Sequence, residues 1–328
     1  MLKEQLQAKD FASDQDLRWC PGCGDFAILK QTQVVLANLG VSLENSVFIS
    51  GIGCSSRFPY YMNTYGMHSI HGRATAIASG LRLTRPDLDI WVVTGDGDSL
   101  SIGGNHLIHL LRRDLNLNVM LFNNEIYGLT KGQYSPTSKP NTITKSSPFG
   151  SKEQPFDTLA LAFGAGASFI ARSIDREAKH LQEMLARTHN HQGTSLIEIY
   201  QNCHIFNDGA FNDFSDRKLQ KDNALFLEDQ KPLIFGQELE FGIKFDGIQP
   251  VIVDRNDYSD DELWLHDEKD RNKASLLCNI VDPSIEFPKV FGVVYDLEKK
   301  LISCKKKNNF LGNTYIDNLI RGEQTWEV

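Results

Sequence analysis

The chain has 328 residues, of which 41% are hydrophobic and 23% are charged. This composition is typical of a globular protein of about two domains, and it excludes disordered and collagen-like chains. No apolar run of about 18 residues is present, so we expect no membrane span. The polar segment 1–16 lacks the apolar stretch of a secretory signal, which favours a cytoplasmic location.

The net charge of −8 is unevenly distributed along the chain. Residues 1–204 carry 18 Lys and Arg against 18 Asp and Glu, whereas residues 205–328 carry 16 against 24. No basic stripe with interleaved aromatic residues is present, which argues against nucleic acid as a ligand. The acidic C-terminal part is most simply interpreted as a solvated surface.

Strand-like and helix-like segments alternate over the first two-thirds of the chain. The apolar patterns predict strands at 47–50, 90–93, 118–122, 168–171 and 195–200, and helices at 26–39, 73–83, 104–113, 156–164 and 174–188. Near-continuous apolar strands separated by helices are typical of a parallel sheet covered on both faces. The sequence therefore predicts an α/β fold.

Two features suggest how this fold is organised. The stretch 134–154 is rich in Ser, Thr and Pro, and a structureless loop of that length is usually a functional loop or an assembly contact. After Asn207 the apolar period becomes irregular. We therefore expect an α/β domain over 1–204 and a loop-rich C-terminal extension over 205–328, packed on the core or on a partner subunit.

Cys20 and Cys23 form a Cys-Pro-Gly-Cys-Gly motif. Two residues between the thiolates let both sulfurs reach one metal centre, and the glycines permit a tight turn around it. The pair alone fits half of a zinc site, a redox dithiol or one corner of an iron–sulfur cluster. These three interpretations stay open on the motif alone.

The other four cysteines fall into two groups. Cys54 and Cys203 each follow an apolar, strand-like run, and functional groups gather where the strands of a parallel sheet end. Cys278 and Cys304 lie in the C-terminal part, where a buried small residue and an incidental surface thiol are the better interpretations. In a reducing compartment we expect no structural disulfide.

A Gly-Asp-Gly-Asp-Ser segment at 95–99 follows one predicted strand, and Asn123 and Asn124 end the next. Asp96 and Asn124 are 28 residues apart, the length of one helix and one strand, so adjacent parallel strands would bring them side by side. A carboxylate, an amide oxygen and a nearby backbone carbonyl are hard-oxygen ligands suited to Mg²⁺.

Phosphates commonly complete the coordination of such a Mg²⁺ ion. Glycines let backbone N–H groups approach phosphate oxygens, and the helix expected after Ser99 would offer its positive N-terminus. A lone Gly-Asp-Gly is by default a turn, but the second motif at this spacing favours a cofactor site. Gly51-Ile52-Gly53 is no dinucleotide fingerprint, because no third glycine follows.

The ordered motifs resemble those of the β subunits of 2-oxoacid:ferredoxin oxidoreductases, more specifically of the 2-oxoglutarate type. The resemblance covers about residues 15–210. It rests on Trp19-Cys20-Pro21-Gly22-Cys23-Gly24, Gly51-Ile52-Gly53-Cys54-Ser55-Ser56-Arg57, His71-Gly72-Arg73, Gly95-Asp96-Gly97-Asp98, the run from Asn123 to Gln133, and Cys203.

The resemblance implies three bound groups. A [4Fe–4S] cluster would be held by Cys20, Cys23, Cys54 and Cys203. Thiamine diphosphate would be anchored through Mg²⁺ on Asp96, Asn124 and the backbone carbonyl of Ile126. The cofactor would be lined by Ile52, Gly53, Cys54, Ser55, His71, Gly72, Arg73, Gly97, Asp98, Gly128 and Leu129.

The resemblance also implies a reaction and partners. The enzyme would convert a 2-oxoacid and coenzyme A to acyl-CoA and CO₂, and would pass electrons through the cluster to ferredoxin. The carboxylate that activates thiamine would come from an α subunit, in an αβ heterodimer or (αβ)₂ assembly. Arg57 departs from the Lys that relatives often have there, which weakens the inference of substrate specificity, but it keeps the positive charge for contact with a substrate carboxylate. His71 is a second candidate for substrate or cofactor contact.

Three alternatives stay open. Pyruvate or another 2-oxoacid shares the reactive group of 2-oxoglutarate. A cluster-free thiamine-dependent decarboxylase would leave Cys20, Cys23, Cys54 and Cys203 unexplained. A binding protein with a structural Cys₄ zinc site would leave the predicted Mg²⁺ site idle.

Overall fold

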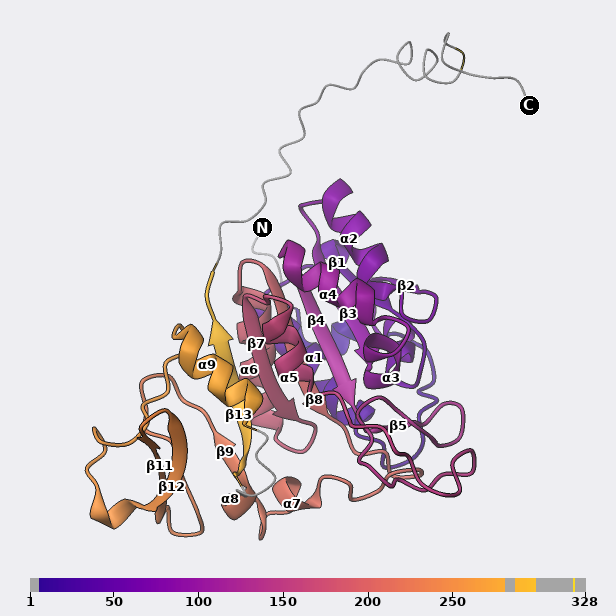
Figure 1. The fold of residues 1–328 in the computed structure, drawn as a ribbon. Coiled ribbons are helices and arrows are strands. Elements are labelled where there is room, and N and C mark those ends of the chain that lie inside the picture. The colour runs from indigo at the N-terminus through magenta and orange to yellow at the C-terminus, as the bar shows by residue number, and fades with distance from the viewer. Residues whose placement is uncertain (1–5, 281–286, 299–320, 322–328) are drawn as a thin grey trace.

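The computed structural model describes residues 6–280, 287–298 and 321. In this part of the chain one eight-stranded sheet forms the centre of the molecule, with the order β2-β1-β3-β4-β8-β7-β13-β9 (Figure 1). Its strands are β1 (Ser46–Ser50), β2 (Tyr65–His68), β3 (Asp89–Gly95), β4 (Leu117–Asn123), β7 (Phe169–Ile174), β8 (Thr194–Tyr200), β9 (Ala224–Phe226) and β13 (Lys289–Asp296).

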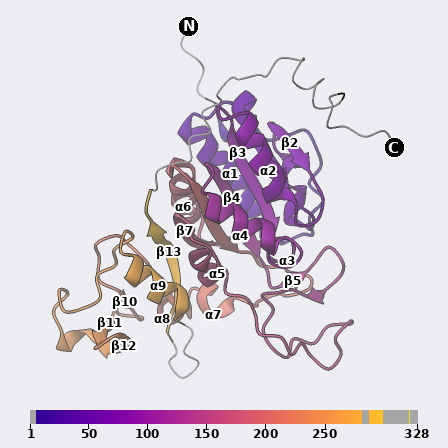
Figure 2. The same ribbon diagram turned by 45° about the horizontal axis from the view of Figure 1, so that its top comes forward.

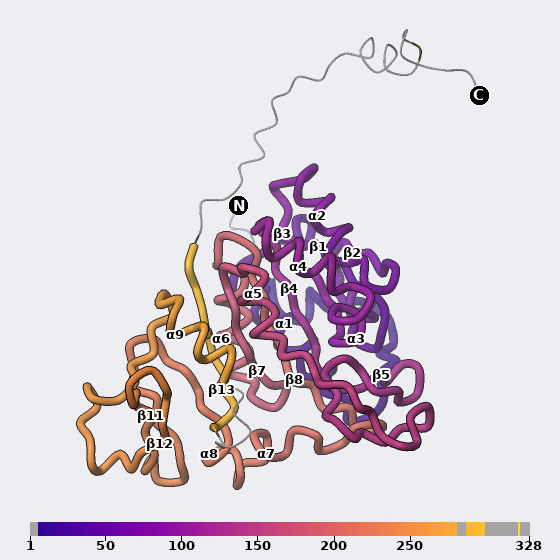
Figure 3. The backbone as a smooth tube through the Cα atoms, viewed as in Figure 1, coloured from indigo at the N-terminus to yellow at the C-terminus, as the bar shows by residue number. Residues whose placement is uncertain are grey.

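The strands from β2 to β7 in this order pair in parallel, as predicted. Their carboxyl ends therefore meet at one edge of the sheet. Gly95 of β3 pairs with Phe122 of β4, so Asp96 and Asn124 leave adjacent strands within one residue of the same level. The loop after β6 (Gln133–Tyr134) lies at the end toward which the β4 arrow points in Figure 1, and Figure 3 traces the same path as a tube.

Helices cover both faces of the sheet. The helices are α1 (Asp25–Leu39), α2 (Ala74–Thr84), α3 (Asp96–Leu100), α4 (Gly104–Arg113), α5 (Thr158–Gly164), α6 (Ala178–Asn190), α7 (Asn212–Ser215), α8 (Gln220–Asn223) and α9 (Arg271–Asn279). The short 3₁₀ helices are η1 (Ala8–Phe11), η2 (Leu43–Asn45), η3 (Ser55–Tyr61) and η4 (Arg255–Asp257).

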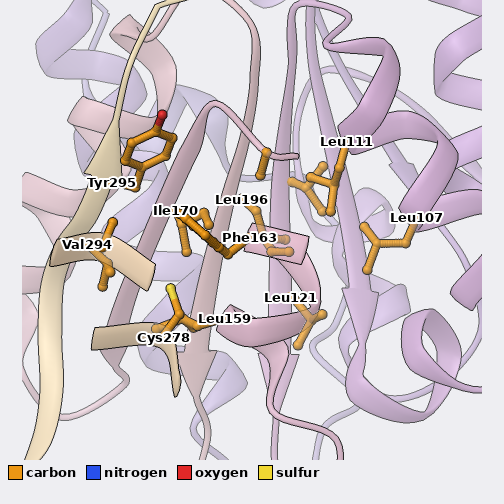
Figure 4. Packing of buried hydrophobic residues seen from close by; sticks show 14 of the residues in the cluster. Leu107, Leu111, Leu121, Leu159, Phe163, Ile170, Leu196, Cys278, Val294 and Tyr295 are labelled. Atoms are coloured by element: carbon orange, nitrogen blue, oxygen red, sulfur yellow. The ribbon is translucent and has the colours of Figure 1, made fainter. Parts of the chain in front are cut away.

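Successive side chains of the central strands point alternately into two apolar cores, one on each face of the sheet. In β3, Ile90 and Val92 face the core built with α2, α4, α5 and α9, which Figure 4 shows. Trp91 and Val93 face the opposite core, built with α1 and α6. This period of two explains the continuous apolar runs, because both faces of the strands are buried.

The C-terminal part of the chain contributes to the same sheet. Strand β13 pairs antiparallel with β7 and parallel with β9. A separate three-stranded sheet of β10 (Ile234–Phe235), β11 (Phe241–Asp246) and β12 (Gln249–Asp254) lies beyond α9 (Figure 2). Cys278 is buried in the core of α9, as predicted, and Cys304 lies outside the described residues. The boundary near 205 stays a prediction.

The strands and helices predicted for the first two-thirds of the chain are present, but the structure contains further elements and some bounds differ. The edge strand β2 was not predicted, because its side chains are exposed and carry no apolar pattern. The helix predicted at 104–113 is α4, and a separate five-residue helix, α3, which was not predicted, begins at Asp96 directly after β3. The helix expected from 174 begins at Ala178, because β7 extends to Ile174. Within the described residues, no helix is both long and apolar enough to cross a membrane.

Candidate active site

Two neighbouring cavities lie at the carboxyl ends of β1, β3 and β4. We name them the oxygen cavity and the thiol cavity. The oxygen cavity, of about 220 Å³, is lined by Ile52, Gly53, Cys54, Ser55, His71, Gly95, Asp96, Asp98, Phe122, Asn124, Ile126, Tyr127, Gly128, Leu129 and Thr130. The thiol cavity, of about 210 Å³, is lined by Cys20, Cys23, Cys54 and Cys203 together with eleven further residues.

Asp96 is buried on the wall of the oxygen cavity. Its Oδ2 accepts hydrogen bonds from the hydroxyl groups of Ser135 at 2.5 Å and Thr137 at 2.7 Å. Burial raises the pKa of the Asp96 carboxyl to about 6, and these two hydrogen bonds oppose that rise. A cation in the cavity would therefore relieve the cost of keeping this carboxylate charged.

Asn124 and Ile126 complete the oxygen ligand set predicted for Mg²⁺. The Asn124 side chain donates from Nδ2 to Gln201 Oε1 at 2.9 Å, and its Oδ1 accepts from the Ile126 amide at 3.2 Å. These contacts fix the orientation of the amide. All three predicted ligand residues line the same cavity, so the residue types that a hard cation prefers are gathered in one place.

Asp98 accepts hydrogen bonds from two loops beside the oxygen cavity, one that contains Ile52 and one that contains His71 and Gly72. Its Oδ1 accepts from the Ile52 amide at 3.0 Å, from the Gly72 amide at 2.7 Å and from His71 Nδ1 at 2.7 Å. Its Oδ2 accepts from the Thr94 hydroxyl at 2.7 Å. Asp98 therefore holds the backbone of both loops, in addition to lining the cavity as predicted.

Three of the predicted cofactor residues do not line the oxygen cavity. Gly72 lies behind it, at a φ of +69° and packed on the backbone of Gly103, where a Cβ would clash. Arg73 donates from Nη1 to the carbonyls of His71 and Gly72 and so closes its own turn. Gly97 lies beneath the Tyr127 ring. These residues shape the cavity from outside.

The four predicted cluster cysteines are brought together around the thiol cavity. A Cβ built on Gly128 would lie 3.5 Å from Cys203 Sγ and 3.7 Å from Cys54 Sγ, so both sulfurs face the space beside this glycine. Burial raises the pKa of the Cys54 thiol to about 12, and it raises the pKa values of Cys23 and Cys203 as well. A metal centre would displace these protons.

The four cysteines of the thiol cavity are spread around its wall and do not converge on the position of a single metal ion. Within the described ranges, no three His, Cys, Asp or Glu side chains lie at the spacing of a single metal ion. The five cysteines of the described residues are free thiols. A cluster that offers a separate iron to each thiolate fits this spread of sulfurs.

Arg57 lies on η3 and lines the thiol cavity, not the oxygen cavity. It shares that wall with Arg18 and Lys131, and its charge lowers the pKa of Cys54 against the larger, raising effect of burial. His71 does line the oxygen cavity, with its ring edge-on to Tyr127 at 6.4 Å. The two predicted contact residues therefore lie on different cavities.

Several residues of the site were not predicted. Ser135 and Thr137 belong to a loop whose Ser and Thr content was noted, but no local pattern shows which hydroxyl meets Asp96. Trp19 Nε1 donates to the Cys54 carbonyl at 2.7 Å, and Gln201 Nε2 donates to Cys23 Sγ at 3.3 Å. Such contacts join segments distant in sequence and leave no local signal.

The chain matches known proteins along its whole length. Residues 51–199 match the family of the C-terminal TPP binding domain of thiamine pyrophosphate enzymes. The chain is 45% identical to the 2-oxoglutarate oxidoreductase subunit KorB of Mycobacterium tuberculosis, over 98% of this chain and 88% of that one. It is 41% identical to a 2-oxoacid:ferredoxin oxidoreductase subunit beta of Sulfolobus sp, over 63% and 68%.

A solved structure has the same fold. It is a 2-oxoglutarate:ferredoxin oxidoreductase from Magnetococcus marinus with 2-oxoglutarate, coenzyme A and succinyl-CoA bound, 30% identical to this chain. The TM-score is 0.75, and the match covers 99% of this chain and 94% of that one. The 45% identity over 98% of the chain, the match to the thiamine pyrophosphate domain and the shared fold lead to one conclusion. The chain belongs to the family of 2-oxoacid:ferredoxin oxidoreductase β subunits.

Proposed function

We propose that this chain, with an α subunit, oxidatively decarboxylates 2-oxoglutarate with coenzyme A to succinyl-CoA and CO₂ and passes the electrons to ferredoxin. The observation that carries the proposal is the contact between the two cavities. Cys54, Asn124, Gly128 and Leu129 line both of them. A cofactor held by oxygen ligands would thus lie next to a redox centre held by thiolates. The names of the relatives support 2-oxoglutarate over pyruvate and other 2-oxoacids.

The oxygen cavity would hold thiamine diphosphate through Mg²⁺. Asp96, Asn124 and the Ile126 carbonyl would be the protein ligands of the ion, and their shared cavity and hard-oxygen character support this assignment. When bound, thiamine diphosphate supplies a carbon nucleophile and an electron sink for loss of CO₂. Ile52, Gly53, Ser55, Gly128 and Leu129 would bound the cofactor, with Gly72, Arg73 and Gly97 shaping the cavity from behind.

The chain's own residues prepare this cavity before any ligand enters. Asp98 accepts hydrogen bonds from the backbone N–H groups of Ile52 and Gly72 and so holds both loops at the cavity. Of the described residues that line the cavity, the carboxylates are Asp96 and Asp98. The first would be a metal ligand, and the second already accepts four hydrogen bonds. The carboxylate that activates thiamine would therefore come from the α subunit.

The thiol cavity would hold one [4Fe–4S] cluster on Cys20, Cys23, Cys54 and Cys203. When bound, such a cluster accepts electrons one at a time and hands them to ferredoxin. Gln201 and Trp19 would hold two of the ligands in place, through Cys23 Sγ and the Cys54 carbonyl. Arg57 would add a positive charge at the cavity wall, suited to the distal carboxylate of 2-oxoglutarate.

The proposal is tested on the chain co-purified with its α subunit. We expect 2-oxoglutarate to reduce ferredoxin or a viologen dye in a reaction that requires coenzyme A, and we expect a brown absorption band that dithionite bleaches. The chain alone should show no turnover. Release of CO₂ without dye reduction would indicate a cluster-free decarboxylase, and a colourless zinc-loaded complex would indicate a structural metal site. Sizing of the complex distinguishes αβ from (αβ)₂.

A further inference from the structure

A chain of buried hydrogen bonds runs from β7 to the wall of the oxygen cavity. Arg172 Nε donates to Glu198 Oε2 at 2.6 Å, and Glu198 Oε1 accepts from Asn123 Nδ2 at 2.8 Å. The Thr137 hydroxyl lies 2.9 Å from Asn123 Oδ1 and 2.7 Å from Asp96 Oδ2. Four contacts thus connect a guanidinium in the sheet to the proposed metal ligand.

The register of strands β7, β8 and β4 brings the first three residues of this hydrogen-bond series together. Arg172 of β7 pairs with Glu198 of β8, and Glu198 pairs with Leu121 of β4, two residues before Asn123. The three polar residues therefore lie on the neighbouring strands β7, β8 and β4, with Asn123 nearest the carboxyl edge. Figure 1 shows these strands. Thr137 reaches the end of this series from the loop after β6.

The two charged residues of this hydrogen-bond series are almost fully buried. Arg172 is 3% exposed and Glu198 is 1% exposed. A buried ion pair is seldom more stabilising than apolar residues of the same volume, so a gain in fold stability does not account for it. Buried polar networks do fix geometry, because every donor and acceptor has one preferred partner.

The donor and acceptor roles along this series fix the orientation of each side chain in turn, from Glu198 toward Asp96. The Glu198 carboxylate only accepts, so it holds the NH₂ group of Asn123 and turns Asn123 Oδ1 toward Thr137. The single hydroxyl hydrogen of Thr137 is shared between Asn123 Oδ1 and Asp96 Oδ2, and the Ser135 hydroxyl also donates to Asp96 Oδ2. The backbone N–H of Gly97 also hydrogen-bonds this carboxyl. These donors together fix the Asp96 carboxylate while it lines the oxygen cavity.

We propose that Glu198 and Arg172 are positioning residues that orient Asp96 toward the cation of the oxygen cavity, through Asn123 and Thr137. This inference rests on the proposed assignment of Mg²⁺ to Asp96. Ligating carboxylates are commonly held by such outer partners, whose loss weakens metal affinity roughly 10- to 100-fold.

The test measures the Mg²⁺ concentration that half-saturates thiamine diphosphate binding to the αβ complex, by calorimetry. Thr137→Val should raise this concentration about 10-fold or more, and Thr137→Ser should restore it. Thr142→Val is the matched control, because its hydroxyl lies in the same loop but bonds the Lys139 carbonyl. Iron content and thermal midpoint are followed in parallel, and iron content should stay unchanged.

The remote pair is tested by replacing both charges, Arg172→Met with Glu198→Gln, so that neither member of this pair stays charged without the other. This variant should raise the half-saturating Mg²⁺ concentration as Thr137→Val does, and combining it with Thr137→Val should add little, since both break one path. Asn123→Ser, which keeps the ion pair, gives the same readout if the paired replacement does not assemble.

Two different failures are distinguishable. Wild-type Mg²⁺ dependence in Asp96→Asn would overturn the metal assignment itself. If Asp96→Asn abolishes Mg²⁺-dependent binding but Thr137→Val and the paired replacement behave as wild type, the positioning proposal is wrong. Effects that multiply in the combined variant would also overturn it, because they would show that the residues act independently.

Discussion

The Tyr127 side chain closes over Gly97. Its hydroxyl donates to the Gly97 carbonyl at 2.8 Å, and its ring occupies the space that a Cβ on residue 97 would need. Gly97 lies in the first turn of α3, one residue after Asp96, and Tyr127 lines the oxygen cavity. The glycine is therefore required by a close approach of a side chain, at a φ outside the left-handed region.

Gly97→Ala should distort the oxygen cavity, because the added methyl group would push the Tyr127 ring away. We expect thiamine diphosphate affinity to fall and the free energy of unfolding to decrease by about 1–3 kcal/mol, as for overpacked cores. Calorimetry and urea unfolding of the complex measure both. Gly80→Ala is the control: this exposed glycine of α2 has open space around it, and the change should stabilise the helix slightly. Equal effects of the two substitutions would contradict this account.

Replacing Cys20, Cys23, Cys54 or Cys203 by Ser should abolish or severely reduce the bound iron and sulfide, because each supplies one thiolate of the thiol cavity. Cys278→Ala is the matched control, since this thiol is buried in the α9 core and should leave the iron content unchanged. Iron and sulfide analysis of the purified complexes gives the answer. Full iron content in Cys203→Ser would show that the ligand set is wrong.

Arg57→Ala should lower kcat/KM for 2-oxoglutarate more than for pyruvate, because pyruvate lacks the distal carboxylate. An Arg–carboxylate hydrogen bond contributes about 1.5–3 kcal/mol, which corresponds to a roughly 10- to 150-fold change in the rate ratio. Arg18→Ala tests a neighbouring cation on the same cavity wall, whose guanidinium pairs with Asp16. An equal fall for both substrates in Arg57→Ala would mean that Arg57 is structural or contacts only groups that the two share.

His180 should make the fold sensitive to acid. Burial lowers its pKa from 6.5 to about 4, with its ring edge-on to Phe226. In the unfolded chain His180 binds a proton below about pH 6.5, whereas in the folded chain it stays neutral down to about pH 4. The free energy of unfolding therefore decreases as the pH falls through this window. The shift corresponds to a loss of at most about 3 kcal/mol.

Urea unfolding between pH 7.5 and 4.5 checks this expectation. His180→Phe should flatten the loss of stability in this range. Ser173→Ala is the control, because it removes the hydroxyl 2.9 Å from His180 Nδ1 but leaves the ring that takes up the proton. The same pH dependence in His180→Phe and wild type would show that other groups cause the acid sensitivity.

Local patterns in the sequence determined the strands and helices of the parallel core. The apolar runs of β3, β4 and β8 are buried on both faces, and α1 ends as expected at Gly40, which adopts a φ of +69°. The spacing of Asp96 and Asn124 correctly predicted that they leave adjacent strands, because one helix connects one parallel strand to the next. The full set of Cys20, Cys23, Cys54 and Cys203 came from the family resemblance, and the structure brings these four residues together around one cavity.

Only the tertiary structure decided which distant groups meet. Strand β13 joins β7 across more than a hundred residues, and its antiparallel direction follows from no local pattern. The hydroxyl groups that hold Asp96, the ring that covers Gly97 and the ion pair of Arg172 with Glu198 likewise join separate segments. A side chain's local sequence sets its chemistry and its element, but its partner depends on how loops close and strands align, which is a property of the whole chain.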